Sequence, residues 1–302
     1  MKKTIWISFL CILILVTGFA AGCNLQDNTG GTEPEPQCTL SSEELQARKQ
    51  SLQGKYVSVL GDSISTYEGI SNAGTVNTTT EGYNAWYNGD WKNALASADE
   101  TYWGSVISRY GMELLVNNSC GGSRLMQAGG TGVYADAGYK RVENLAANTG
   151  ELNGTQPDII FLYMGTNDFI GNTVLGDLTE DSFDNIVLDD GYITPATFTE
   201  AYIITMEKAT KLYPNAQIFL FTLIPTLYNT SWEYLDDYNV RIREIAAHYE
   251  EAVLVDIAAE SGITPENYQK YTFDGTHPNR LGFAAISSVL EQAILNHPSV
   301  SG

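Results

Sequence analysis

The chain has 302 residues, of which 43% are hydrophobic and 17% are charged, a composition typical of a folded globular protein. Its 16 lysines and arginines stand against 36 aspartates and glutamates, and the formal net charge of −20 argues against nucleic acid or anionic lipid headgroups as partners. Only one stretch, near the N-terminus, is apolar enough to enter a bilayer, which excludes a bundle of transmembrane helices.

The N-terminus has the pattern of an export signal. A basic start, an apolar run over residues 5–16 and small residues at positions 20–22 are typical of a secretory signal peptide. Cys23 follows directly, and Ala-Ala-Gly-Cys resembles the lipobox of bacterial lipoproteins, in which this cysteine is acylated. We therefore expect residues 1–22 to be a lipoprotein signal and Cys23 to attach an exported protein to the membrane through lipid alone, with ordinary secretion as the alternative.

Residues 23–40 contain Gly-Gly and Glu-Pro-Glu-Pro and offer almost nothing to bury, which predicts a flexible tether. Ser41 followed by Glu44 resembles a capping box that opens a polar helix to about Leu52. The remaining length suits one α/β core, so we expect residues 41–302 to form a single domain.

The body alternates predicted strands and helices. Short apolar runs without polar alternation predict strands that are buried on both faces of a parallel sheet; they are Tyr56–Leu60, Leu114–Asn117, Asp158–Met164, Gln217–Ile224 and Ala252–Asp256. Helical spacing of apolar residues follows over residues 202–213, 235–249 and 286–294. This order predicts a doubly wound α/β/α sandwich with a mainly parallel five-stranded, flavodoxin-like sheet, and a site at the carboxyl ends of the strands.

Two stretches fit this sandwich poorly. Residues 69–100 form an insertion that is rich in Gly, Asn and Thr and carries Tyr83, Trp86, Tyr87 and Trp91, and residues 171–194 are acidic. Because each follows a strand end, both are expected to form walls of the pocket. The acidic residues between 177 and 190 could hold calcium, but they lack the spacing of an EF-hand loop, which favours a solvated acidic face.

One histidine has a pattern suited to catalysis. His248 lies in a predicted helix and His297 near the C-terminus, so both are interpreted as structural or solvated. His277 lies in Asp-Gly-Thr-His-Pro, where Asp274 can bond one ring nitrogen and leave the other basic. Pro278 disfavours helical geometry at His277 and so keeps it in a loop, although Asp-x-x-His also occurs as a purely structural pair.

Ser63 is the candidate partner of this pair. It follows the first predicted strand in Leu-Gly-Asp-Ser, where it could open a helix at the carboxyl edge of the sheet. An ordinary helix N-cap is the alternative interpretation. The sequence around it is not Gly-x-Ser-x-Gly, which disfavours the α/β-hydrolase elbow.

Four segments in order resemble the SGNH (GDSL) hydrolase family. They are Gly-Asp-Ser at 61–63, Asn-Asn-Ser-Cys-Gly-Gly-Ser at 117–123, Gly-Thr-Asn-Asp at 165–168 and Asp-x-x-His-Pro at 274–278. The likeness spans roughly residues 55–297, and the string GDSISTYEG is similar to a subgroup of bacterial secreted members. The long insertion and the second glycine at position 121 depart from the family pattern.

The resemblance implies roles for five residues. Ser63 would be the nucleophile, His277 the general base and Asp274 its orienting carboxylate. The oxyanion hole would consist of the N–H groups of Ser63 and Gly122 and the side-chain amide of Asn167. No metal or cofactor is implied, and no His/Cys cluster has zinc spacing.

Three neighbouring residues receive no chemical role. We expect Asp62 and Asp168 to hold loops in place rather than to react. Cys120, next to the implied oxyanion hole, is interpreted as a small packing residue, because no second histidine is evidently placed to activate it.

The leading hypothesis is a serine esterase that removes acetyl or other short acyl groups from carbohydrate, because the aromatic insertion offers stacking faces for sugar rings. Those aromatics could equally pack the insertion itself. The first alternative is a lipase or lysophospholipase, which would need a wide apolar groove. The second is a non-catalytic glycan-binding lipoprotein, which would have no need of a base, its orienter and an oxyanion donor together.

Overall fold

The computed structural model describes residues 41–67, 95–126, 137–179, 181–184 and 195–297. The expected signal peptide, Cys23, the tether and the four aromatics of the insertion lie outside these residues. The described elements are α1 Ser42–Leu52, β1 Tyr56–Gly61, η1 Ser63–Ser65, η2 Ala98–Glu100, α2 Tyr102–Tyr110, β2 Glu113–Ser119, α3 Gly138–Arg141, η3 Val142–Asn144, β3 Ile159–Tyr163, α4 Thr166–Ile170, α5 Asp181–Asp184, α6 Phe198–Leu212, β4 Gln217–Phe221, α7 Trp232–His248, β5 Ala252–Val255, α8 Ile257–Glu260, α9 Tyr268–Tyr271 and α10 Arg280–Asn296.

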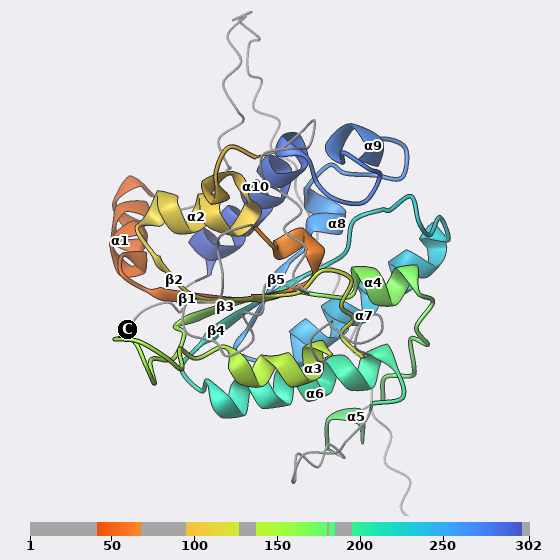
Figure 1. The fold of residues 1–302 in the computed structure, drawn as a ribbon, viewed down its shortest axis with the longest axis horizontal. Helices are drawn as coiled ribbons and strands as arrows, with labels where there is room; N and C mark the ends of the chain where they lie inside the picture. The colour runs from red at the N-terminus through yellow and green to blue at the C-terminus, as the bar shows by residue number, and fades with distance from the viewer. Residues whose placement is uncertain (1–40, 68–94, 127–136, 180, 185–194, 298–302) are drawn as a thin grey trace, which may run out of the picture. The chain divides into compact units, whose positions relative to one another are not determined.

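The five strands form one parallel sheet in the order β2-β1-β3-β4-β5 (Figure 1). All five predicted strands are confirmed, and they are joined in parallel throughout. β4 ends at Phe221, although the apolar run continues to Ile224. Beyond that point the N–H of Leu223, which points to the β3 side of the strand as the N–H of Gln217 does, donates to Oδ1 of Asn239 on α7 instead of to the sheet.

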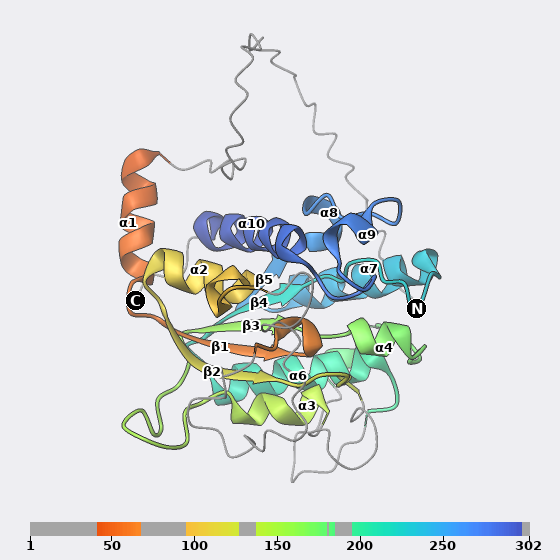
Figure 2. The ribbon, with the colours of Figure 1, turned by 45° about the horizontal axis from the view of Figure 1, so that its top comes forward.

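Helices cover both faces of the sheet (Figure 2). α1, α2 and α10 pack together on one face, while α3, α6 and α7 pack on the other, with α7 against β4 and β5. This is the doubly wound α/β/α sandwich that the sequence predicts. None of the helices in the described part of the chain is long and apolar enough to cross a membrane.

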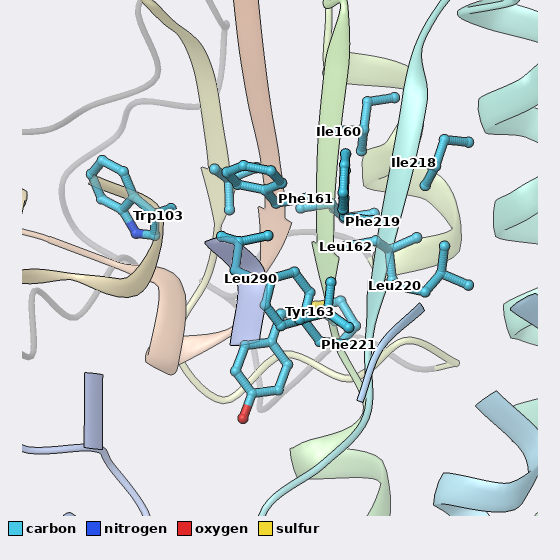
Figure 3. Close-up of a cluster of buried hydrophobic side chains, with 14 of the residues drawn as sticks. Trp103, Ile160, Phe161, Leu162, Tyr163, Ile218, Phe219, Leu220, Phe221 and Leu290 are labelled. Carbon is cyan, nitrogen blue, oxygen red and sulfur yellow. The ribbon is translucent and has the colours of Figure 1, made fainter. Parts of the chain in front are cut away.

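The core lies around the central strand β3 and its neighbour β4, whose residues are all buried (Figure 3). Phe161 packs edge-to-face on Phe219, and Tyr163 stacks on Phe221 with ring centroids 5.2 Å apart. Aromatic pairs of this kind stabilise by about 1 kcal/mol beyond the area they bury. The strands that end at the site are therefore held in a densely packed layer.

The strand order places a topological switch at β1. The chain moves from β1 to β2 on one side, and β3 then pairs with β1 on the other side. In open parallel sheets, ligands bind at the carboxyl ends of the strands beside such a switch. Ser63 follows β1 and Asn167 follows β3, so both lie at this point.

Helix ends follow the signals in the sequence. The capping box at Ser41 is confirmed, because Ser41 and Glu44 each accept the other's backbone N–H. α6 ends at Leu212, just before Pro214. α10 begins after Asn279, whose side chain accepts the N–H groups of residues 281 and 282, so His277 stays outside the helix as predicted.

Candidate active site

Ser63, His277 and Asp274 form a continuous hydrogen-bonded chain. Nε2 of His277 lies 2.8 Å from Oγ of Ser63, and Nδ1 lies 2.6 Å from Oδ2 of Asp274. The serine and the histidine are nearly buried, with 6% and 7% of their surfaces exposed. A carboxylate on one ring nitrogen fixes the tautomer that leaves the other nitrogen able to accept a proton from the serine hydroxyl.

The turn that carries Asp274 and His277 is shaped by its own hydrogen bonds. Oδ1 of Asp274 accepts the backbone N–H groups of Thr276 and His277, at 3.0 and 2.8 Å. Gly275 has a φ of +88°, and a Cβ there would lie 2.6 Å from Cβ of Leu227. The turn therefore requires glycine at this position both for its backbone and for its packing.

A second turn, residues 226–229 after β4, supports the first. The N–H of Leu227 donates to the carbonyl of Gly275 at 2.7 Å, and the hydroxyls of Thr226 and Thr276 bond each other. At its other end, Nδ2 of Asn229 donates to the carbonyl of Phe169 on α4 at 2.8 Å. This 226–229 turn thus joins the His277 turn to the helix that carries Asn167.

Ser63 begins the short helix η1, and the segment after it is fixed by two donors. The carbonyl of Ser65 accepts Nδ2 of Asn117 on β2 at 2.9 Å and Nε1 of Trp103 on α2 at 3.0 Å. Asp62 caps η1 by accepting the N–H of Ile64 at 2.9 Å. The segment that carries the serine is therefore anchored to β2 and to α2 rather than left as a free loop.

The sequence-predicted oxyanion donors lie around the serine segment. Nδ2 of Asn167 is 3.1 Å from the carbonyl of Ser123 and 3.3 Å from Oδ2 of Asp62. Gly122 is exposed and has a φ of +72°, whereas Gly121 is buried. Of the two adjacent glycines, Gly122 is thus the one that can face a substrate.

Asp168 holds the loop after β2, which carries Gly122. Its carboxylate is fully buried and accepts the N–H groups of Leu125 at 2.6 Å and Met126 at 3.2 Å. Asp62, also buried, bonds η1 and Asn167. Both carboxylates make the kind of loop-holding contacts that the sequence analysis expects of them.

Arg141 is a buried residue of the site that the sequence reasoning missed. Its guanidinium donates to the carbonyl of Gly61 at 3.0 Å, to Oγ of Ser123 at 2.6 Å and to the carbonyl of Asn118. It therefore ties the end of β1, which leads to Ser63, to the loop of Gly122. Nothing in a single sequence marks Arg141, because its acceptors come from segments that are distant along the chain.

The carboxyl groups of the site have shifted pKa values. Burial raises the pKa of Asp62 to about 6, against the lowering effects of the Ile64 N–H and of the His277 and Arg141 charges. Burial likewise raises the pKa of Asp168 to about 7. Burial by itself would raise the pKa of Asp274, but the hydrogen bond and charge of His277 outweigh this effect and lower the pKa. Asp274 therefore stays ionised at the pH where His277 must accept a proton.

The other residues considered from the sequence are not part of the hydrogen-bonded chain from Ser63 to Asp274. His248 stacks on Phe183 with ring centroids 3.5 Å apart, and His297 follows the end of α10. Cys120 is fully buried beside the Gly122 loop. Within the described residues, which include only part of the acidic segment 177–190, no group of three or more His, Cys, Asp or Glu side chains could hold a metal ion.

Comparisons with known proteins identify the fold and the family. A family profile described as GDSL-like lipase/acylhydrolase matches residues 55–294. A solved structure described as a GDSL-like lipase from Bacteroides uniformis is 26% identical, with a TM-score of 0.52, and the match covers 78% of this chain and 93% of that one. A second GDSL-like lipase, from Bacteroides ovatus, is 23% identical with a TM-score of 0.55, covering 79% and 97%.

A third structure, of a protein from Lactobacillus plantarum, is 18% identical with a TM-score of 0.56, covering 81% and 98% of the two chains. At that level of identity it supports the fold alone. The search of curated protein sequences found no match to the chain.

Proposed function

The chain belongs to the GDSL-like lipase/acylhydrolase family and is an esterase hydrolase, and on this premise we propose that it removes acetyl or other short acyl groups from carbohydrate through an acyl-serine intermediate. The observation that carries the chemistry is the hydrogen-bonded chain from Ser63 through His277 to Asp274. A glycan-binding protein without catalysis would have no use for this arrangement beside an amide donor.

In the first half-reaction, Oγ of Ser63 attacks the ester carbonyl carbon while Nε2 of His277 takes the hydroxyl proton. The carbonyl oxygen becomes an oxyanion that accepts the N–H groups of Ser63 and Gly122. Collapse of this intermediate breaks the bond to the alcohol oxygen, which receives the proton from His277. Asp274 stabilises the imidazolium through its 2.6 Å contact and does not itself take the proton.

In the second half-reaction, His277 accepts a proton from water, and the resulting hydroxyl attacks the acyl-serine. The oxyanion forms again, the bond to Oγ breaks, and Ser63 regains its proton from His277. Asn167 joins the oxyanion hole by releasing its 3.3 Å contact with Asp62, which is the longer of its two contacts. The products are a carboxylic acid and the free saccharide hydroxyl.

The preference for short acyl groups is supported by the surface next to the His277 turn. Leu227 and Tyr228 are exposed large apolar side chains there, at 50% and 63%. Two such side chains can cover an acetyl group or one face of a sugar ring, whereas a long acyl chain needs a longer apolar groove. The aromatic insertion at 69–100 supports sugar recognition by its composition.

We also propose that the enzyme is exported and attached to a membrane through lipid on Cys23, as its N-terminal sequence suggests. Cys23→Ala should then move the protein from the membrane fraction to the soluble fraction of the producing cell. Equal membrane retention of the variant and the native protein would refute the lipid anchor.

The test of the esterase chemistry uses p-nitrophenyl acetate, butyrate and octanoate beside acetylated xylo-oligosaccharides. The full chain and its Ser63→Ala variant are compared, since the variant lacks only one hydroxyl and should fold alike. We expect serine-dependent release that favours acetate and the sugar ester. A preference for octanoate would instead indicate lipid esters, and equal activity of both proteins would remove Ser63 from the mechanism.

A further inference from the structure

Arg124 stands out among the arginines of a strongly acidic chain. The other six of the seven arginines donate hydrogen bonds to carbonyls or carboxylates: Arg48, Arg109, Arg141, Arg241, Arg243 and Arg280. Arg124 is half-buried, and within the described part of the chain its guanidinium has no hydrogen-bond acceptor and no ion-pair partner. With a net charge of −20, partners of opposite sign are abundant elsewhere on the protein, so the position of this cation requires an explanation.

The guanidinium is held close to the proposed oxyanion donor. A Cβ on Gly171 would lie 2.2 Å from Nη2 and 2.3 Å from Cζ of Arg124, so the guanidinium lies against the glycine backbone. The N–H of Gly171 donates to the carbonyl of Asn167 at 3.0 Å, which places the glycine about one helical turn beyond the amide. At its other end, Arg124 follows Ser123, whose carbonyl accepts Nδ2 of Asn167.

The same edge of the site continues to the exposed apolar pair. Asn229 bonds both the carbonyl of Phe169 and Oδ1 of Asn172, at 2.8 and 3.2 Å, and Tyr228 precedes it in the 226–229 turn. Contacts therefore run from Arg124 across the end of α4 to Asn229, the chain neighbour of Tyr228. This edge offers one cation and one exposed aromatic ring on either side of the end of α4, the helix that carries Asn167.

We propose that Arg124 forms a subsite for a carboxylate on the alcohol part of the ester, so that the enzyme deacylates acidic saccharides in preference to neutral ones. This inference rests on the proposed function and names its substrate class. The guanidinium fork matches a carboxylate with two parallel hydrogen bonds, and Tyr228 can stack on a sugar ring. A local cation also offsets the repulsion that a chain of net charge −20 exerts on an anionic substrate.

The alternative explanation is that Arg124 only stabilises the buried carboxylate of Asp168. Burial raises the pKa of Asp168 to about 7, and the charge of Arg124 partly opposes that shift. In that case loss of the charge would disturb the loop of Gly122 and lower the rate of hydrolysis of every substrate alike. A carboxylate subsite instead predicts a loss confined to acidic substrates. Selectivity, rather than activity, therefore distinguishes the two roles.

Two variants and one control provide this comparison. Arg124→Gln removes the charge, and Gly171→Ala pushes the guanidinium aside while keeping it. Gly171 has a φ of −85°, so alanine does not strain its backbone. Lys211→Gln, an exposed position near the end of α6 and so at the amino edge of the sheet, changes the net charge by the same amount.

The assay measures kcat/KM for an acetylated oligogalacturonide, an acetylated xylo-oligosaccharide of equal length, acetylated glucose 6-phosphate and p-nitrophenyl acetate. Arg124→Gln should lower the value for the oligogalacturonide by about 10-fold to 100-fold and the values for the neutral substrates by less than about twofold. Gly171→Ala should act in the same direction, and Lys211→Gln should leave the ratio unchanged. Raising salt from about 50 mM to about 500 mM should reduce the preference.

An equal loss on all substrates, or no loss on the acidic ones, would overturn the proposal. An Arg124-dependent preference for the sugar phosphate over the uronide would also overturn it, in favour of a phosphate ligand. Calorimetry measures binding of the oligogalacturonide to the Ser63→Ala protein, with and without Arg124→Gln. This measurement distinguishes failure of the carboxylate subsite from failure of the esterase proposal. If Arg124→Gln leaves the affinity for the oligogalacturonide unchanged, the subsite is refuted even when no hydrolysis is detected.

Discussion

The buried carboxylate of Asp62 predicts a pH dependence of stability that a single substitution can isolate. Burial raises its pKa from an ordinary 3.8 to about 6 in the folded protein. Between these two values the folded chain binds a proton that the unfolded chain has already released. The stability contributed by this proton is complete below about pH 4 and is lost as the pH rises through about 6.

The size of the effect follows from the shift. A difference of about 2 pKa units corresponds to about 3 kcal/mol in the free energy of unfolding. Asp62 is fully buried, so solvent does not screen this contribution appreciably. Asp62→Asn removes the titration while Oδ1 can still accept the N–H of Ile64.

Urea unfolding, followed by circular dichroism at pH values from about 4 to about 8, measures the free energy of both proteins. The free energy of unfolding of the native chain minus that of Asp62→Asn should fall by about 3 kcal/mol between pH 4 and pH 7.5. Asp237→Asn, on the exposed side of α7, serves as the matched control for the loss of one carboxyl group. If the difference in the free energy of unfolding between the native chain and Asp62→Asn stays constant to within about 1 kcal/mol over this pH range, burial does not raise the pKa of Asp62 as described.

Three further predictions concern the geometry of the site. Asn167→Ala should lower kcat by about 10²-fold to 10³-fold with little change in KM, because the amide acts on the oxyanion. An unchanged kcat in steady-state assays would show that Asn167 is not an oxyanion donor. Arg141→Met should lower the free energy of unfolding by about 4 kcal/mol in urea titrations, since three buried acceptors lose their donor, and a loss below about 1 kcal/mol would contradict these bonds. Gly275→Ala should cost about 1–2 kcal/mol of stability for its φ of +88° and lower kcat on p-nitrophenyl acetate, and native kinetics would show that the turn tolerates a Cβ.

The strands and the main helices could be predicted because each carries its own signal. β3 and β4 are apolar runs bounded by polar residues, and α6 and α7 have apolar residues at helical spacing. The placement of Ser63 and Asn167 also follows from the sequence, because each comes directly after a strand of a parallel sheet. What the sequence could not give was the end of β4, which depends on a side chain of α7.

The supporting residues of the site depend on contacts between distant segments. Arg141 meets the carbonyl of Gly61 across 80 positions, and Leu227 meets Gly275 only because the ends of β4 and β5 are neighbours in the sheet. Arg124 directly follows a recognisable segment, yet its neighbour Gly171 comes from another strand end. Such pairs have no local periodicity or motif that a single chain could display.

The buried charges of the site explain how its loops can be rigid without belonging to the sheet. Asp168 holds the Gly122 loop through two N–H groups, and Arg141 holds the same loop to the end of β1. Each group costs free energy to bury, as the raised pKa of Asp168 records. An apolar substitute could fill the same volume, but it could not bond backbone groups that no strand or helix satisfies. The charges therefore fix the loop positions on which an oxyanion hole depends, at the expense of stability in the same few residues.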